Sequence, residues 1–152
     1  MEEKPAIDMG AGGKGEEHIL VIDDNEDVRK MLKDVLERRG FFVTTAVNGE
    51  EGLELIAKGD IRIVLSDILM PKINGIEFLD KVREYNLSVE VIMVTGRSSL
   101  DTCVESIEKG ACAYLIKPVM VNEIFEAVDR ARRNIREKQE MIQKILKDKQ
   151  HG

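Results

Sequence analysis

Five short and nearly continuous apolar segments constrain the fold of this chain more than any other feature of its sequence. They occupy positions 18–22, 41–43, 61–65, 89–94 and 112–116. Runs of this length, rich in Val, Ile and Leu, are typical of strands that are covered on both faces, as in a parallel sheet. The recurrence of the runs predicts one sheet of five strands.

Amphipathic helical patterns lie between these runs. The apolar residues that mark them are Val28, Leu32, Val35 and Leu36, then Leu53, Ile56 and Ala57, then Ile76, Leu79 and Val82, and finally Val104, Ile107 and Ala111. Gly40, Gly59 and Gly110 follow three of these helices, where a left-handed cap is favoured. Ser98 and Asp101 resemble a capping box before the fourth helix. Strands that alternate with helices in this way predict a doubly wound α/β fold.

The last helix is predicted to run from about position 122 to about 149, roughly 40 Å at 1.5 Å per residue. Residues along it alternate spacings of four and three, which is the pattern of a heptad seam. The seam consists of Ile124, Val128, Ala131, Ile135, Lys138, Ile142 and Ile145, and Lys138 interrupts it. Two interpretations stay open, a paired helix or coiled coil and a solvated helix that frays.

The composition narrows the class of protein. A chain of 152 residues with a net charge of −6 is expected to form one domain without a large nucleic-acid surface, which would need a basic patch. No signal peptide and no apolar run of ~20 residues is present, so we expect a cytoplasmic protein outside the membrane. Residues 1–17 lack apolar periodicity and are predicted to be a flexible arm. Cys103 and Cys112 are expected to be small core residues, with a disulfide as the less favoured alternative.

Polar residues stand where four of the predicted strands end. Asp23 and Asp24 end the first strand, Asp67 the third, Thr95 the fourth and Lys117 the fifth. The strands of a parallel sheet all end at the same edge, where functional groups gather near the switch point of the sheet. Three carboxylates are therefore expected to meet one hydroxyl and one ammonium.

Three carboxylates this close together repel one another and should not coexist without a cation. Oxygen ligands with open positions suit Mg²⁺, which keeps water and phosphate oxygens in its shell. A carboxylate beside Mg²⁺ can act as a nucleophile and form an acyl phosphate. Lys117 and Thr95 would supply donors to the oxygens of the transferred group. The pattern thus favours phosphoryl transfer to Asp67.

The motifs VIDDNEDVRKML, VLSDILMPKINGIEFL, IMVTGRSS and AYLIKPV carry these residues. Over about residues 18–135 the chain resembles the receiver domain of two-component response regulators. The resemblance implies a flavodoxin-like fold, a five-stranded parallel doubly wound sheet of order 2-1-3-4-5 with an extended C-terminal helix. Residues 136–152 would then extend the last helix as a coiled-coil linker.

The resemblance also implies how the site would hold metal and phosphoryl group. Asp67 would be the phosphoacceptor and a metal ligand. Asp24 would bind Mg²⁺ directly and Asp23 as an outer ligand, and the main-chain carbonyl of Leu69 would complete the protein ligands.

Further roles follow from the same resemblance. Lys117 would pair with the acceptor and then with the phosphoryl group, and the peptide bond after it is expected to be cis. Gly96 and Ile68 would contact the phosphoryl group through the main chain. Thr95 would be the switch hydroxyl, and Tyr114 the aromatic residue that moves inward on activation.

The function implied is a signalling switch and not a metabolic enzyme. A histidine kinase or histidine phosphotransfer protein would donate the phosphoryl group. Phosphorylation would then alter a surface that binds a partner, or that forms a homodimer through the fourth and fifth helices and the C-terminal extension. No direct binding of nucleic acid is expected.

Two other functions use part of the same residue pattern. A hydrolase of the haloacid-dehalogenase type would need a second Asp two residues after the nucleophile, where Leu69 stands, and a cap domain. A pseudo-receiver that is never phosphorylated would usually have lost an acid, the acceptor or the lysine, and all of these are present.

Overall fold

The computed structural model describes residues 17–85 and 88–151. The strands are β1 (His18–Ile22), β2 (Phe42–Ala46), β3 (Ile63–Ser66), β4 (Glu90–Thr95) and β5 (Ala113–Ile116). The helices are α1 (Glu26–Arg38), α2 (Gly49–Ala57), α3 (Gly75–Tyr85), α4 (Leu100–Glu108) and α5 (Val121–His151). The predicted arm at 1–17 falls outside the described residues apart from Glu17, and the predicted domain boundary after residue 135 stays a prediction.

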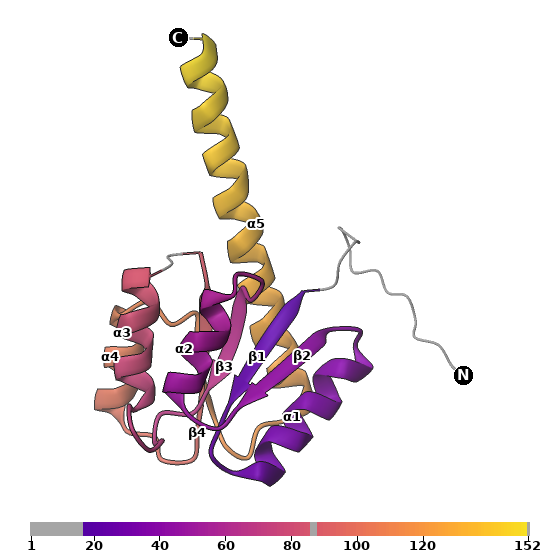
Figure 1. Ribbon diagram of the computed structural model, residues 1–152, viewed down its shortest axis with the longest axis vertical. Coiled ribbons are helices and arrows are strands. Elements are labelled where there is room, and N and C mark those ends of the chain that lie inside the picture. Colours follow the sequence, from indigo (N-terminus) through magenta and orange to yellow (C-terminus); the bar gives the residue numbers. More distant parts are fainter. Residues whose placement is uncertain (1–16, 86–87, 152) are drawn as a thin grey trace.

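The five strands form one sheet in the order β2-β1-β3-β4-β5, and every neighbouring pair is parallel. The predicted fold class and strand order are therefore confirmed. Helices α1 and α5 cover one face of the sheet, and α2, α3 and α4 cover the other (Figure 1). In the register of the sheet, Ile22 lies opposite Ser66, and Thr95 lies opposite Ile116. The strand ends that carry the predicted site thus share one edge.

The central strands are buried on both faces and separate two hydrophobic cores. Ile19 and Val21 of β1 face α1 and α5, where they pack with Leu36 and Val128. The alternate residues of the same strand, Leu20 and Ile22, belong to the core under α2 and α3. This alternation is the period of two that a strand imposes on its side chains. β5, in contrast, is an edge strand whose side chains are only partly covered, so the expectation of burial on both faces is wrong there.

Helix α4 differs from its sequence prediction in two respects. Its capping box is formed by Ser99 and Thr102, one residue later than predicted, because Ser99 holds the extended backbone that a cap requires. Val104 and Ile107 are about half exposed, whereas Ser106 is fully buried. Of the predicted apolar face, Val104 and Ile107 are therefore largely uncovered, whereas Ala111, just beyond the helix, is buried in the core. Helix α4 itself contributes little apolar surface to the core.

Helix α5 divides into two parts. Ile124, Val128, Ala131 and Ile135 are buried against the sheet, whereas every side chain from 136 to 150 is exposed. The second part protrudes beyond the body of the protein (Figure 1). The predicted seam is thus half core contact and half free surface. No helix in the described part of the chain has the length and apolar character to span a membrane.

Candidate functional site

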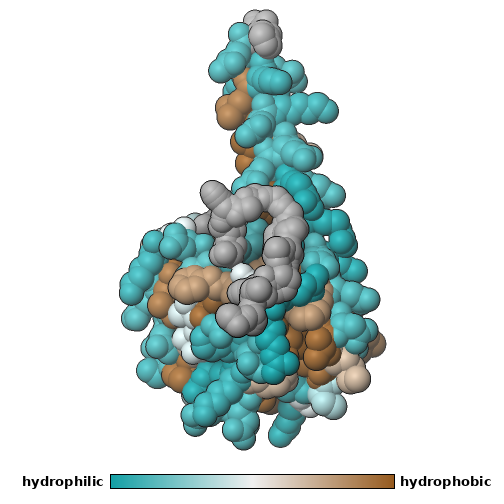
Figure 2. All heavy atoms as spheres, turned by 90° about the vertical axis from the view of Figure 1, so that its right-hand side faces the viewer, coloured by the Kyte–Doolittle hydropathy of each residue, from teal (hydrophilic) through white to brown (hydrophobic). Residues whose placement is uncertain are grey.

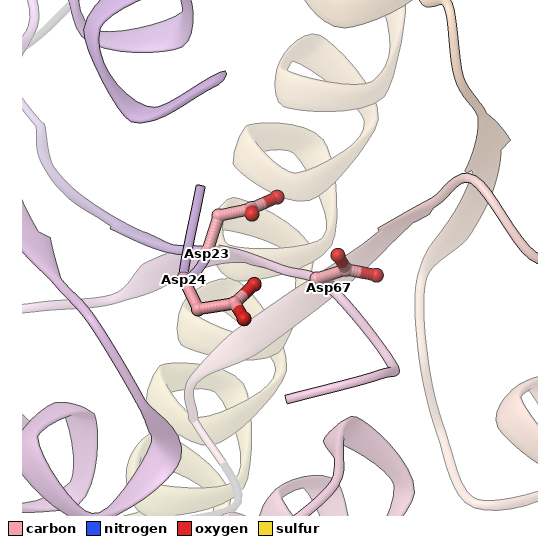
Figure 3. Close-up of side chains that lie close together, drawn as sticks. All are labelled: Asp23, Asp24 and Asp67. Atoms are coloured by element: carbon pink, nitrogen blue, oxygen red, sulfur yellow. The ribbon is translucent and has the colours of Figure 1, made fainter. Parts of the chain in front are cut away.

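The predicted convergence at the ends of the strands is found in the structure. Carboxylate oxygens of Asp23, Asp24 and Asp67 lie within 4.8 Å of one another. Figure 3 shows the three side chains gathered at the ends of β1 and β3. Lys117 reaches them from the end of β5 with its ammonium. Sequence positions up to 94 apart thus meet in one pocket.

Asp23 and Asp24 differ in their exposure to solvent. Asp23 is 2% exposed, and its Oδ1 accepts a hydrogen bond of 2.9 Å from the main-chain N–H of Asn25. The guanidinium of Arg29 donates to the main-chain oxygen of Asp23 at 2.8 Å. Asp24 is exposed. Asp23 is therefore fixed by its surroundings, while Asp24 is open to solvent and to a ligand.

The carboxylate of Asp67 is held by main-chain donors on one side and by an ammonium on the other. Its Oδ1 accepts hydrogen bonds from the N–H of Ile68 at 2.6 Å and of Leu69 at 3.4 Å. Its Oδ2 accepts from Lys117 at 3.0 Å. The side chain is largely buried. These contacts hold the carboxylate of Asp67, the predicted nucleophile, in a fixed orientation at the end of β3.

Gly75 supports the segment that carries Asp67. Its N–H donates to the carbonyl of Ile68 at 2.7 Å. A Cβ at this position would collide with the main-chain oxygen of Asp67 and would lie 2.8 Å from the Cα of Ile68. Since only glycine lacks a Cβ, the sequence needs glycine where the start of α3 approaches the end of β3.

Lys117 bridges two of the acids. Its Nζ donates to Asp23 Oδ2 at 2.7 Å and to Asp67 Oδ2 at 3.0 Å. Partial burial alone would lower the pKa of Lys117, but the hydrogen bonds and charges of Asp23 and Asp67 outweigh it and raise the pKa above its usual value. The ammonium therefore stays charged at neutral pH. The Lys117–Pro118 peptide bond is cis, as expected.

Thr95 and Gly96 lie at the same edge of the sheet. Thr95 is fully buried, and its hydroxyl accepts a hydrogen bond of 3.1 Å from the N–H of Arg97. A Cβ on Gly96 would lie 3.7 Å from the Lys117 side chain, so this residue is beside the lysine. In the described hydrogen bonds, the Thr95 hydroxyl thus contacts its own loop rather than Asp67.

Tyr114 lies on β5, which β4 separates from β3 and from Asp67 at its end. Its hydroxyl is 2.8 Å from the hydroxyl of Thr102 in the first turn of α4. Thr102 also accepts from the N–H of Ser99 in the capping box. The tyrosine is half-buried and borders an open groove with Ile107 and Glu123. Its ring position is therefore tied to the start of α4.

The charges of the pocket define its chemistry. The Lys117 ammonium bonds to two of the three clustered carboxylates, Asp23 and Asp67. One positive charge against three acids leaves negative charge that costs free energy in a partly buried site. The clustered donors are carboxylate oxygens, which are hard ligands and suit Mg²⁺. The residues present therefore fit a small divalent cation.

Fold and site together define a receiver domain, and the comparisons with known proteins agree. The family model of the response regulator receiver domain matches residues 19–129. The chain belongs to this family and is the receiver domain of a two-component response regulator.

Individual relatives are similar over most of the chain. The "Uncharacterized transcriptional regulatory protein YkoG" of Bacillus subtilis is 34% identical over 129 residues, which are 85% of this chain and 57% of the relative. The chain thus spans little more than half the length of that relative. A crystal structure of a response regulator receiver domain protein from Clostridium thermocellum has a TM-score of 0.75 and 32% identity, with 82% of this chain and 98% of the other covered. The beryllofluoride-activated NtrC4 receiver domain dimer has a TM-score of 0.72 and 32% identity, with 75% and 94% covered.

Three residues around the site were missed in the sequence. Asn25 follows the two acids and caps α1 through a bond to the N–H of Val28, a role that its position before a helical pattern could have indicated. Arg29 and Thr102 carry no such signal, because their contacts depend on how α1 and α4 lie on the sheet.

Proposed function

We propose that this chain is a phosphoacceptor switch in a two-component phosphorelay and that it accepts its phosphoryl group on Asp67. The observation that carries the proposal is the pairing of the Asp67 carboxylate with Lys117 beside two further acids. The phosphoryl donor is the phosphohistidine of a histidine kinase or of a histidine phosphotransfer protein.

The transfer exchanges one bond for another. An oxygen of the Asp67 carboxylate attacks phosphorus, the P–N bond of the donor breaks, and the imidazole nitrogen leaves with the electron pair and takes up a proton. Lys117 holds the carboxylate beforehand and then the phosphoryl oxygens. Thr95 and the main chain at Gly96 and Ile68 supply further donors.

Asp23, Asp24, Asp67 and the carbonyl of Leu69 would hold Mg²⁺. A bound Mg²⁺ offsets the charge between the carboxylate and the incoming phosphoryl group. The chain's own catalysis is limited to its phosphorylation and dephosphorylation.

The output depends on movements of two side chains, those of Thr95 and Tyr114. The Thr95 hydroxyl leaves Arg97 for the phosphoryl group, and Tyr114 leaves Thr102 and turns inward. The face of α4, β5 and α5 then changes its affinity for a partner or for a second copy, in a cytoplasmic setting without direct contact to nucleic acid. The dimer of the NtrC4 receiver domain supports self-association as one form of output.

The test is Mg²⁺-dependent labelling with acetyl phosphate, followed by intact mass. One phosphoryl group is expected on the wild type and on Asp60→Asn, an exposed acid elsewhere, and none on Asp67→Asn. Absence of label on the wild type would refute the switch. Steady release of phosphate from phosphate esters would favour the hydrolase instead.

A further inference from the structure

The exposed part of α5 carries an apolar face that none of the described residues of the body covers. Ile142, Ile145 and Leu146 are each more than half exposed, and Met141 beside them is 63% exposed. In Figure 2, brown apolar surface interrupts the teal of the protruding helix along one side. We call the face of Ile142, Ile145 and Leu146 the overhang face.

The overhang face points in the same direction as the buried face of the same helix. Eighteen residues make about five full turns of an α-helix. Ile142 therefore lies directly above Ile124, Ile145 above Ala127 and Leu146 above Val128, displaced by about 27 Å along the axis. Those three lower residues are buried on the sheet. The overhang face thus continues the core face beyond the edge of the body.

The helix is anchored at the point where it leaves the body. Glu90, the first residue of β4, is 3% exposed and accepts hydrogen bonds from Asn134 at 3.1 Å and from Lys138 at 2.8 Å. Lys138, which interrupts the heptad seam, is therefore an attachment to the sheet rather than a defect in a coiled coil. The anchor fixes the direction in which the overhang face points.

This direction decides how a second copy can approach. In a parallel pair the two helices would face each other with the same side along their whole length. Nearer the N-terminus of α5 that side is covered by the sheet, so the sheets of the two copies would clash. In an antiparallel pair the two bodies lie at opposite ends, and only the protruding segments overlap. Apolar residues then meet apolar residues, with Ile142 opposite the partner's Ile145.

We propose that the overhang face binds the overhang face of a second copy in antiparallel orientation. The proposal rests on the proposed function only in taking self-association as a form of output. The surface that it uses, the overhang face, is separate from the face of α4, β5 and α5 on the body. The contact is smaller than the ~800 Å² per partner of a standard interface, so a dissociation constant on the order of 10–100 μM is expected.

Sedimentation of the full chain over a range of concentrations tests the contact. Ile142→Glu is expected to weaken the dimer at least tenfold, because it places a charge in the centre of the apolar contact. Lys147→Glu lies toward the opposite side of the same helix and changes the net charge more, yet should leave the dimer intact. A monomer at all concentrations, or equal effects of both variants, would overturn the proposal.

Cross-linking tests the orientation. In a background with Cys103→Ser and Cys112→Ala, single variants Gln139→Cys and Gln150→Cys are mixed under an added oxidant. The antiparallel pair predicts a disulfide mainly between 139 of one copy and 150 of the other. Predominant 139–139 and 150–150 products would contradict it.

Two further arms separate this inference from the proposed function. Ile107→Glu on the face of α4 should leave the antiparallel dimer intact, so a loss of dimer in this variant alone would show that the body surface is used instead. Labelling of Asp67 should proceed at the same rate in Ile142→Glu as in the wild type. A failure to label in both would sink the switch and leave the dimer result standing.

Discussion

The ammonium of Lys138 lies 2.8 Å from the buried carboxylate of Glu90, at the edge of the sheet opposite to Asp67. Glu90 is almost fully buried, whereas the Lys138 side chain is about half exposed. The two partners therefore differ in what their loss would cost. Without its partner, the Lys138 ammonium can turn to water, whereas the Glu90 carboxylate would stay buried without the counter-charge of the lysine.

This asymmetry gives the first prediction. Lys138→Met should lower the free energy of unfolding by about 2 kcal/mol, because it leaves Glu90 with Asn134 as its remaining described side-chain partner. Glu90→Gln should cost about 1 kcal/mol, since the amide keeps the bond to Asn134. Urea unfolding measures both values. A larger loss of stability for Glu90→Gln than for Lys138→Met would contradict the expected difference between the two partners.

The second prediction concerns the bond between Thr102 and Tyr114. Thr102→Val removes the partner of the Tyr114 hydroxyl and half of the α4 capping box, so it should destabilise the first turn of α4 by about 1 kcal/mol. Hydrogen exchange of α4 amides measures the loss. In a Tyr85→Phe background, the fluorescence of Tyr114 should report a freer ring. Thr102→Ser keeps the hydroxyl and should behave like the wild type.

The third prediction concerns Gly75. Gly75→Ala places a methyl group against the main chain of Asp67 and Ile68, and we expect a loss of about 2–3 kcal/mol of stability together with slower phosphorylation of Asp67. Gly96→Ala, which meets no atom closer than 3.7 Å, serves as the control for stability. Equal unfolding midpoints of the two variants would count against the close approach.

The fourth prediction uses the backbone of Lys72. This residue has φ of 74°, a left-handed conformation that is unfavourable for a side chain with a Cβ. Lys72→Gly should raise stability by about 0.5–1 kcal/mol, even though it removes an exposed ion pair with Glu50. Lys58→Gly, at φ of −77°, should lower stability instead. Thermal unfolding distinguishes the two signs.

The fifth prediction concerns Cys112. Burial, followed by the charge of Glu90, raises the pKa of its thiol from 9.0 to about 12. The thiolate fraction at pH 8 is thus about a thousandfold lower than in the unfolded chain, and alkylation should slow in proportion. Mass spectrometry after iodoacetamide treatment, with urea-unfolded protein as the control, measures the ratio. The rate should rise about tenfold per pH unit toward pH 12, because only the deprotonated form reacts.

Much of the fold and of the site was determined by the sequence alone. The five apolar runs specify strands through burial, which is a property of each run by itself, and a parallel sheet places all strand ends at one edge. Asp23, Asp24, Asp67, Thr95 and Lys117 were therefore found together without any knowledge of distances. Their detailed partners were not found, since the contact of Arg29 with Asp23 depends on the rotation of α1.

The tertiary structure decided which apolar residues are covered. The spacing of Val104 and Ile107 fits a buried face, but α4 packs at the edge of the sheet through Ser106 and leaves both partly exposed. The heptad seam of α5 is continuous in sequence, yet the sheet ends beneath Ile135, and Lys138 bonds to Glu90 instead of facing a second helix. Periodicity shows that a face is apolar, while the extent of the neighbouring layer decides whether that face is core or free surface.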